Sequence, residues 1–230
     1  MIRRMSVLLI WGAVLSGLLR AAEPVPAAPA AAAVLSRMAE AEKAVVTLRF
    51  SFTQTTFVKM TGEKVVSLGK AQFRRPDRFR VEHFSPRPMT AVSDGKTMWV
   101  YNPARRQVLV DRWKNWAVSA GFPRGLGLLQ EEAGDLGKKY NAVLSSRTAT
   151  ADVLVLTPRA PEASKNASVR AWVDRASGLP LRTELEFPSF RTMTEVSNLE
   201  INPDLPDEAF QFKTPAGVEE FHSDEGKPTP

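Results

Sequence analysis

The residue types that usually carry catalysis are scarce in this sequence. It contains no cysteine and two histidines, His83 and His222. Cysteine-based catalysis and clustered metal sites are therefore excluded, and any serine triad would have to use His83. His83 follows an alternating apolar set, where a lone histidine is more often a packed, hydrogen-bonded residue than a catalyst. His222 lies in a polar C-terminal segment.

The remaining candidate motifs also lack the context that their chemistry needs. Ser51, Ser67 and Ser93 fall in strand-like segments without a G-x-S-x-G elbow. Gly125-Leu126-Gly127 lacks the following Lys-Ser/Thr of a phosphate loop. Glu131-Glu132 is explained by solvation at a helix edge. The sequence therefore predicts a protein that is not an enzyme and carries neither cofactor nor metal.

The N-terminus predicts export. A basic start and a short apolar stretch, Val7–Leu19, are followed by small residues, which is the layout of a signal peptide over residues 1–22. The stretch is too short for a spanning helix. Removing these residues takes the net charge from +6 to about +3. Basic and acidic residues alternate, so a nucleic-acid partner is not expected. Without cysteine, the exported protein has neither disulfides nor a lipid-attachment site.

The elements that would position a site begin after a Pro/Ala-rich tether, residues 23–33. Apolar residues then recur every three or four positions, which predicts an amphipathic helix over about 32–46 that packs on a sheet. Its polar face lacks the basic enrichment of a membrane-surface helix.

From Leu48 the apolar period changes to two, which is typical of half-buried strands. Asp94-Gly95 between apolar runs is a strong hairpin signal. Residues 113–139 interrupt the pattern and predict one or two short helices in an apolar excursion. About eleven strands are predicted, without βαβ alternation, in a single sandwich or barrel: 48–58, 65–74, 78–84, 89–93, 97–101, 107–112, 140–146, 152–157, 168–174, 181–187 and 191–201.

A sheet of this many strands tends to curl, and an apolar concave face would then enclose a cavity. Alternatively, the helices fill that space as an ordinary packed core. The pattern of apolar residues leaves both possibilities open.

A series of motifs from the first strand to Gln107 carries a family resemblance: Phe52-Thr53-Gln54, Gly62, Arg75-Pro76, Phe79, Pro86, Ser93-Asp94-Gly95-Lys96-Thr97, Trp99 and Tyr101-Asn102-Pro103. Their order and spacing resemble the periplasmic outer-membrane lipoprotein carrier family LolA. Residues 156–159, 210–212 and 215–218 resemble its later strands and C-terminus.

The resemblance implies a mainly β fold: an incomplete antiparallel β-barrel of about 11 strands with an N-terminal helix and a short helical lid, enclosing a hydrophobic cavity. It implies a carrier domain over 34–218, followed by a disordered tail over 219–230. It also implies a monomeric periplasmic carrier of lipoprotein acyl chains, which takes them from an inner-membrane ABC transporter to an outer-membrane acceptor. A carrier or sensor of another lipid or glycolipid is the alternative, and an enzyme acting on lipids ranks last.

By the same resemblance, Arg75 is the lid latch, whose side chain bonds backbone carbonyls of the lid. An exposed arginine at a strand end is the competing interpretation, because other arginines surround it. Phe79 matches a residue of the cavity mouth, and Val81 stands where the family has tryptophan. The candidate cavity residues are Phe50, Phe52, Phe79, Val81, Trp99, Leu126 and Leu129.

Overall fold

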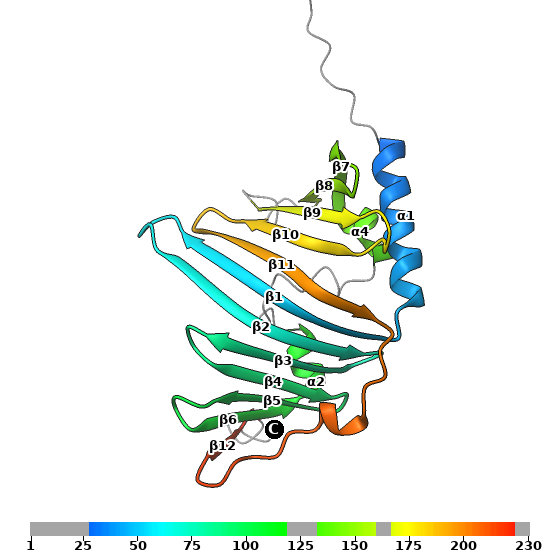
Figure 1. Ribbon diagram of the computed structural model, residues 1–230. Helices are drawn as coiled ribbons and strands as arrows, with labels where there is room; N and C mark the ends of the chain where they lie inside the picture. The colour runs from blue at the N-terminus through cyan, green and yellow to red at the C-terminus, as the bar shows by residue number, and fades with distance from the viewer. Residues whose placement is uncertain (1–27, 119–132, 160–166, 224–230) are drawn as a thin grey trace, which may run out of the picture.

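One curved sheet dominates the computed structural model, which describes residues 28–118, 133–159 and 167–223 (Figure 1). Its strands are β1 (Thr47–Val58), β2 (Lys64–Arg74), β3 (Arg78–Ser85), β4 (Met89–Asp94), β5 (Thr97–Asn102), β6 (Gln107–Arg112), β7 (Tyr140–Arg147), β8 (Ala151–Pro158), β9 (Ser168–Asp174), β10 (Pro180–Glu186), β11 (Phe190–Ile201) and β12 (Glu219–His222). The helices are α1 (Ala28–Ala44), α2 (Trp113–Val118), α4 (Ala133–Lys139) and the short 3-10 helix η2 (Asp207–Phe210).

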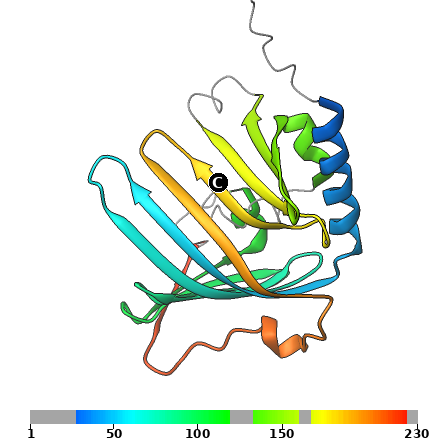
Figure 2. The same cartoon turned by 45° about the horizontal axis from the view of Figure 1, so that its top comes forward.

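The strand order makes the sheet an open, barrel-like wall. It runs β12-β6-β5-β4-β3-β2-β1-β11-β10-β9-β8-β7, so the described edges β12 and β7 are not neighbours. Strand β1 pairs antiparallel with β11, whereas β12 pairs parallel with β6. Figure 2 shows the sheet curving around α2 and α4, with α1 along one side. The predicted mainly β, incomplete barrel is confirmed, with twelve strands in place of about eleven.

Turn chemistry explains the hairpin between β4 and β5. The Asp94 carboxylate accepts hydrogen bonds from the backbone N–H groups of Lys96 and Thr97, at 2.8 and 2.7 Å. Gly95 adopts a φ of 95°, which is open to glycine at little cost. The Asp-Gly pair therefore forms the predicted turn.

Helix α1 begins earlier than the sequence pattern predicted. The tether over 23–33 is wrong for residues 28–33, which are helical. Alanine has the highest helix propensity, and proline is tolerated in a first helical turn, where Pro29 stands. Ala31 is also buried against the sheet, so tertiary packing supports this Ala-rich segment.

The predicted disordered tail is likewise wrong for residues 219–222. They form β12, beside the edge strand β6. The Glu219 N–H donates to the carbonyl oxygen of Arg106 at 3.0 Å and starts this pairing. All four residues of β12 are exposed, so no buried face marked the strand in the sequence.

The predicted helices between β6 and β7 are present as α2 and α4. Residues 119–132 between them, including the candidates Leu126 and Leu129, lie outside the described residues. No helix within the described ranges is long and apolar enough to cross a membrane.

The core consists of two clusters on the same face of the sheet, which we call the inner face. In the first, α1 and α4 pack on β7–β10, with Val34, Met38 and Leu136 against Leu154 and Leu156. The second is formed mainly by β1–β5, and its buried residues include Phe50, Phe79 and Met98. Both helices of the first cluster lie on the concave side in Figure 2.

Candidate functional site

An apolar row crosses the inner face at the level of Phe50. Paired positions lie on the same side of a sheet, and the pairing runs from β1 to β5 through Phe50, Ala71, Val81, Ala91 and Val100. The first four side chains are buried, and Val100 is half-buried. Period-two alternation on five neighbouring strands thus produces one continuous apolar surface.

Aromatic rings extend this surface toward α2. Phe50 stacks on Phe73 with ring centroids 6.0 Å apart, and Phe73 contacts Phe79 at 6.1 Å. Trp113, the first residue of α2, meets Phe79 edge to face at 5.2 Å. Such pairs contribute about 0.5–1.5 kcal/mol each beyond the area that they bury. The Trp113 ring therefore joins helix α2 to the inner face.

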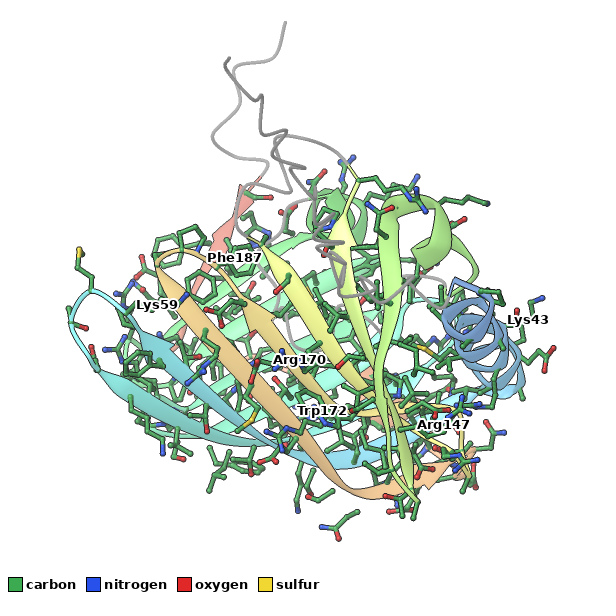
Figure 3. All side chains as sticks on the ribbon, turned by 90° about the horizontal axis from the view of Figure 1, so that it is seen from above. Lys43, Lys59, Arg147, Arg170, Trp172 and Phe187 are labelled. Atoms are coloured by element: carbon green, nitrogen blue, oxygen red, sulfur yellow. The ribbon has the colours of Figure 1, made fainter. Side chains whose placement is uncertain are left out.

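A second aromatic pair lies at the far end of the inner face. Phe187 stacks on Phe190 with ring centroids 4.8 Å apart, across the turn between β10 and β11. Nearby, Lys59 forms an ion pair with Glu186; Figure 3 labels Phe187 and Lys59. The inner face is thus apolar at both ends of its central strands.

Arg75 holds the C-terminal end of α1. Its Nε and Nη2 donate to the carbonyl oxygens of Val45 and Glu42, both at 2.8 Å. The Glu42 carbonyl, which also accepts the Val45 N–H at 3.2 Å, lies in the last turn of α1 at the negative end of the helix dipole, where a guanidinium is favourable. The Glu42 carboxylate lies 3.3 Å from Arg75 and accepts a 2.6 Å hydrogen bond from the N–H of Ala133, where α4 begins.

The described contacts of Arg75 lie at the end of α1, and its predicted contact with carbonyls of the lid stays a prediction. Among the described residues, its acceptors belong to the end of α1, and its connection to α4 passes through Glu42. The arginine still joins the sheet to helices on its inner face. The competing interpretation, a free arginine at a strand end, does not describe these contacts.

One buried carboxylate fixes α1 at its other contact with the sheet. Asp152 on β8 is 1% exposed and accepts hydrogen bonds from Arg37 of α1 at 2.6 Å and Arg147 of β7 at 2.7 Å. Burial alone would raise the pKa of Asp152, but the hydrogen bonds and charges of the two arginines outweigh it and hold the pKa below its usual value.

His83 is packed and hydrogen-bonded, as predicted. Its Nδ1 lies 2.9 Å from the Ser67 hydroxyl, and its ring meets Phe52 edge to face at 5.1 Å. Burial lowers the pKa of His83. Within the described ranges, no group of three or more His, Cys, Asp or Glu side chains is arranged to hold a metal ion. The inner face offers apolar contact and hydrogen bonds.

The sequence profile described as "Outer membrane lipoprotein carrier protein LolA" matches residues 43–213, which span β1 to η2. The chain belongs to the LolA family. Its family segment thus contains Arg75 and the whole apolar row, whereas most of α1 precedes it.

Curated relatives of this LolA-family chain carry the name outer-membrane lipoprotein carrier protein. The protein from Haemophilus influenzae (strain PittEE) is 32% identical over 152 residues, which cover 66% of this chain and 68% of the relative. The protein from Actinobacillus succinogenes is 29% identical over 154 residues, covering 66% and 67%. That from Dechloromonas aromatica is 27% identical over 175 residues, covering 75% and 80%.

Solved structures share the fold of this LolA-family protein. An uncharacterized conserved protein from Thermus thermophilus aligns with a TM-score of 0.55 and 13% identity, covering 84% of this chain and 99% of that one. MucB aligns with a TM-score of 0.51 and 20% identity, covering 82% and 64%. At these identities the likeness concerns the fold alone.

The structure of the LolA-family sheet brings four of the predicted cavity residues together. Phe50, Phe52, Phe79 and Val81 are buried in one cluster on the inner face. Leu126 and Leu129 lie outside the described residues, so their role stays a prediction.

Trp99 was wrongly grouped with them. Its pairing with Val92 places it on the opposite, outer face, where it stacks on Phe212 at 6.4 Å. Because both Trp99 and its neighbour Val100 are apolar, alternation alone did not distinguish the faces. The register with Ala91 assigns Val100 to the inner face.

Sequence reasoning missed Gly69, which this arrangement requires. A Cβ at Gly69 would lie 2.3 Å from Cζ of Phe52 and 2.4 Å from the carbonyl oxygen of Glu82. The Phe52 ring therefore occupies the space above the glycine, next to His83. An isolated glycine within a strand pattern is the signal for such close approach.

Proposed function

We propose that this LolA-family protein is a periplasmic carrier that binds the acyl chains of lipoproteins against its inner face and moves them from the inner to the outer membrane. The observation that supports this most directly is the continuous apolar row from Phe50 to Val100 on the inner face, with α2 packed on the same cluster and α1 and α4 on the neighbouring strands β7–β10. An inner-membrane ABC transporter would supply the cargo, and an outer-membrane acceptor would receive it. The carrier would act as a monomer.

The energy scale supports acyl chains as the ligand. Burying each CH₂ group contributes about 0.8 kcal/mol, so a sixteen-carbon chain gains roughly 12 kcal/mol. Crossing the aqueous periplasm requires burial on this scale. Release then requires that the helices over the inner face be held weakly, and the single guanidinium of Arg75 is suited to that task. We therefore propose Arg75 as a latch that acts through the end of α1.

Binding of a fluorescent sixteen-carbon acyl probe tests the proposal, with two matched tryptophan variants. Val100 and Val110 are both half-buried, on neighbouring strands, and lie on opposite faces. A larger side chain on the inner face should exclude the ligand. We expect Val100→Trp to weaken probe binding at least about tenfold, a change of ~1.4 kcal/mol, and Val110→Trp to leave it unchanged.

If wild-type protein has the circular-dichroism spectrum of a folded β protein but does not bind the probe, the packed-core alternative is supported instead. Equal affinities of the two tryptophan variants would show that the probe does not occupy the inner face. Native mass spectrometry of protein purified from the periplasm identifies the cargo, and a co-purified lipid or glycolipid in place of lipoprotein would support the alternative carrier or sensor.

A further inference from the structure

A row of polar side chains crosses the centre of the inner face. Successive register pairs place Ser67 on β2 beside Gln54 on β1, Gln54 beside Thr194 on β11, and Thr194 beside Thr183 on β10. His83 on β3 extends the row through its contact with Ser67. We call these five side chains, from five adjacent strands, the polar row.

The polar row is bordered by apolar residues on one side and by the hydrogen-bonded pair Thr56–Thr192 on the other. Two positions earlier on β1, Phe52 is 3% exposed and pairs with Val196 of β11. Thr194 and Thr183 are buried, at 2% and 5% exposure, whereas the other members are half-buried. Valine has nearly the same shape as threonine. If the inner face served only to pack against other residues of the protein, valine could stand at positions 183 and 194 without burying a hydroxyl group.

Gln54 and His83 of the polar row have hydrogen-bonding groups without a partner among the described residues. Gln54 Nε2 donates to the Thr194 hydroxyl at 3.2 Å, and neither the second N–H of this amide nor its oxygen bonds a described residue. Nε2 of His83 is buried and likewise has no hydrogen-bond partner in the described part of the chain. A buried polar atom left unpaired is unfavourable, so a ligand atom that pairs with it gains affinity.

The chemistry of the row indicates which ligand atoms fit. It presents hydroxyl and amide donors, together with a histidine whose lowered pKa keeps it neutral at pH 7. No member carries a formal charge, so the row suits neutral acceptors better than a phosphate. We propose that the polar row binds the ester or amide carbonyl groups that join acyl chains to the head of a lipid. This inference rests on the proposed function, because it requires acyl chains on the inner face.

A matched pair of competitors tests the inference in the full-length mature protein. Dialkanoyl glycerol carries two ester carbonyls, and dialkyl glycerol of equal chain length carries ethers in their place. Each competes with the fluorescent acyl probe for wild type and for Thr194→Val, which removes one hydroxyl from the row and keeps the side-chain shape. Thr53→Val on the outer face is the control. Urea midpoints establish that each variant is folded.

We expect wild type and Thr53→Val to prefer the ester over the ether about fivefold to tenfold, the effect of roughly one hydrogen bond. Thr194→Val should lose most of this preference while retaining its affinity for the ether. Gln54→Leu should do the same and replaces Thr194→Val if that variant does not fold. A triacylated lipopeptide and phosphatidylglycerol, compared in the same assay, distinguish a lipoprotein source of the carbonyls from a phospholipid source.

The outcomes separate the two proposals. If neither glycerol lipid binds wild type, the proposed function fails. If both bind with equal affinity, or if the row variants lose ester and ether alike, the acyl-binding function stands and the carbonyl-binding role of the polar row is overturned. In that case the spare hydrogen-bonding groups are satisfied by water.

Discussion

Replacing Arg75 by leucine tests whether this side chain holds the helices over the inner face. The change removes two hydrogen bonds of 2.8 Å from a charged guanidinium to the carbonyl oxygens of Glu42 and Val45. Such bonds contribute roughly 1.5–3 kcal/mol each, but the Arg75 side chain is 46% exposed and solvent reduces the gain. We expect Arg75→Leu to lower the free energy of unfolding by about 2 kcal/mol, which corresponds to ~4–8 °C in Tm.

The local destabilisation caused by Arg75→Leu should be largest where α4 begins. The Glu42 carboxylate, 15% exposed, bonds the N–H of Ala133 and lies 3.3 Å from Arg75. Without the guanidinium, this bridge loses its positively charged member, so the Ala133 amide should exchange its hydrogen severalfold faster. Urea denaturation followed by circular dichroism measures the global effect, and hydrogen exchange measures the local one.

Arg87→Leu is the matched control, because Arg87 also precedes a proline, is exposed, and makes no hydrogen bond or ion pair with any described residue. Its change should stay within about 0.5 kcal/mol. We expect Arg75→Leu to keep the β spectrum yet impair lipoprotein hand-off. Equal urea midpoints and equal Ala133 exchange in the two variants, or normal hand-off by Arg75→Leu, would refute the latch.

Two further predictions concern the buried residues Gly69 and Asp152, with the exposed Gly137 as a comparison. Gly69→Ala should lower the free energy of unfolding by roughly 3 kcal/mol, because its Cβ would lie 2.3 Å from the Phe52 ring. In α4, the Cβ of Gly137→Ala would meet its nearest neighbour at 3.7 Å. This change should raise the free energy of unfolding by about 0.5–1 kcal/mol in the same urea titration. Asp152→Asn should cost roughly 3 kcal/mol at pH 7 by leaving Arg37 without its carboxylate. Because the folded-state pKa of Asp152 is depressed, its contribution is present above the unfolded pKa of about 4 and is lost as pH falls through the folded value. The difference between the urea midpoints of wild type and Asp152→Asn should therefore shrink as the pH is lowered below the unfolded pKa of about 4, and a difference that stays constant down to the acid limit of folding would contradict this account.

The strands were predictable because alternation and turn chemistry are local signals. Asp94-Gly95 specifies its hairpin through bonds within four residues. The start of α1 was not predictable in the same way, because an Ala-rich segment with prolines suits a tether as well as a helix until Ala31 is buried against the sheet. β12 depends on a parallel partner more than a hundred residues earlier in the sequence, so no local pattern marks it.

The candidate site was predictable only in part, for the same physical reason. Alternation divides a strand into two sets but does not say which set faces inward, and on β5 both Trp99 and Val100 are apolar. Cross-strand register resolves this, because Val81 pairs with Ala91 and Ala91 with Val100. The polar row also depends on register, since Ser67 and Thr183 are remote in sequence and are aligned only in the folded sheet.

The two contacts of α1 together make this helix a spacer of fixed length. Arg37 is bound to Asp152 on β8, and about one and a half turns later Glu42 is bound to Arg75, which follows β2. These attachment points lie in different parts of the sheet, because β2 and β8 are separated by β1, β11, β10 and β9 in its order. A helix attached at both points couples their spacing to its own position, so a widening of the sheet between β2 and β8 would have to break the contact of Arg37 or that of Arg75. A change in the diameter of the interior therefore requires a movement of the N-terminal helix α1.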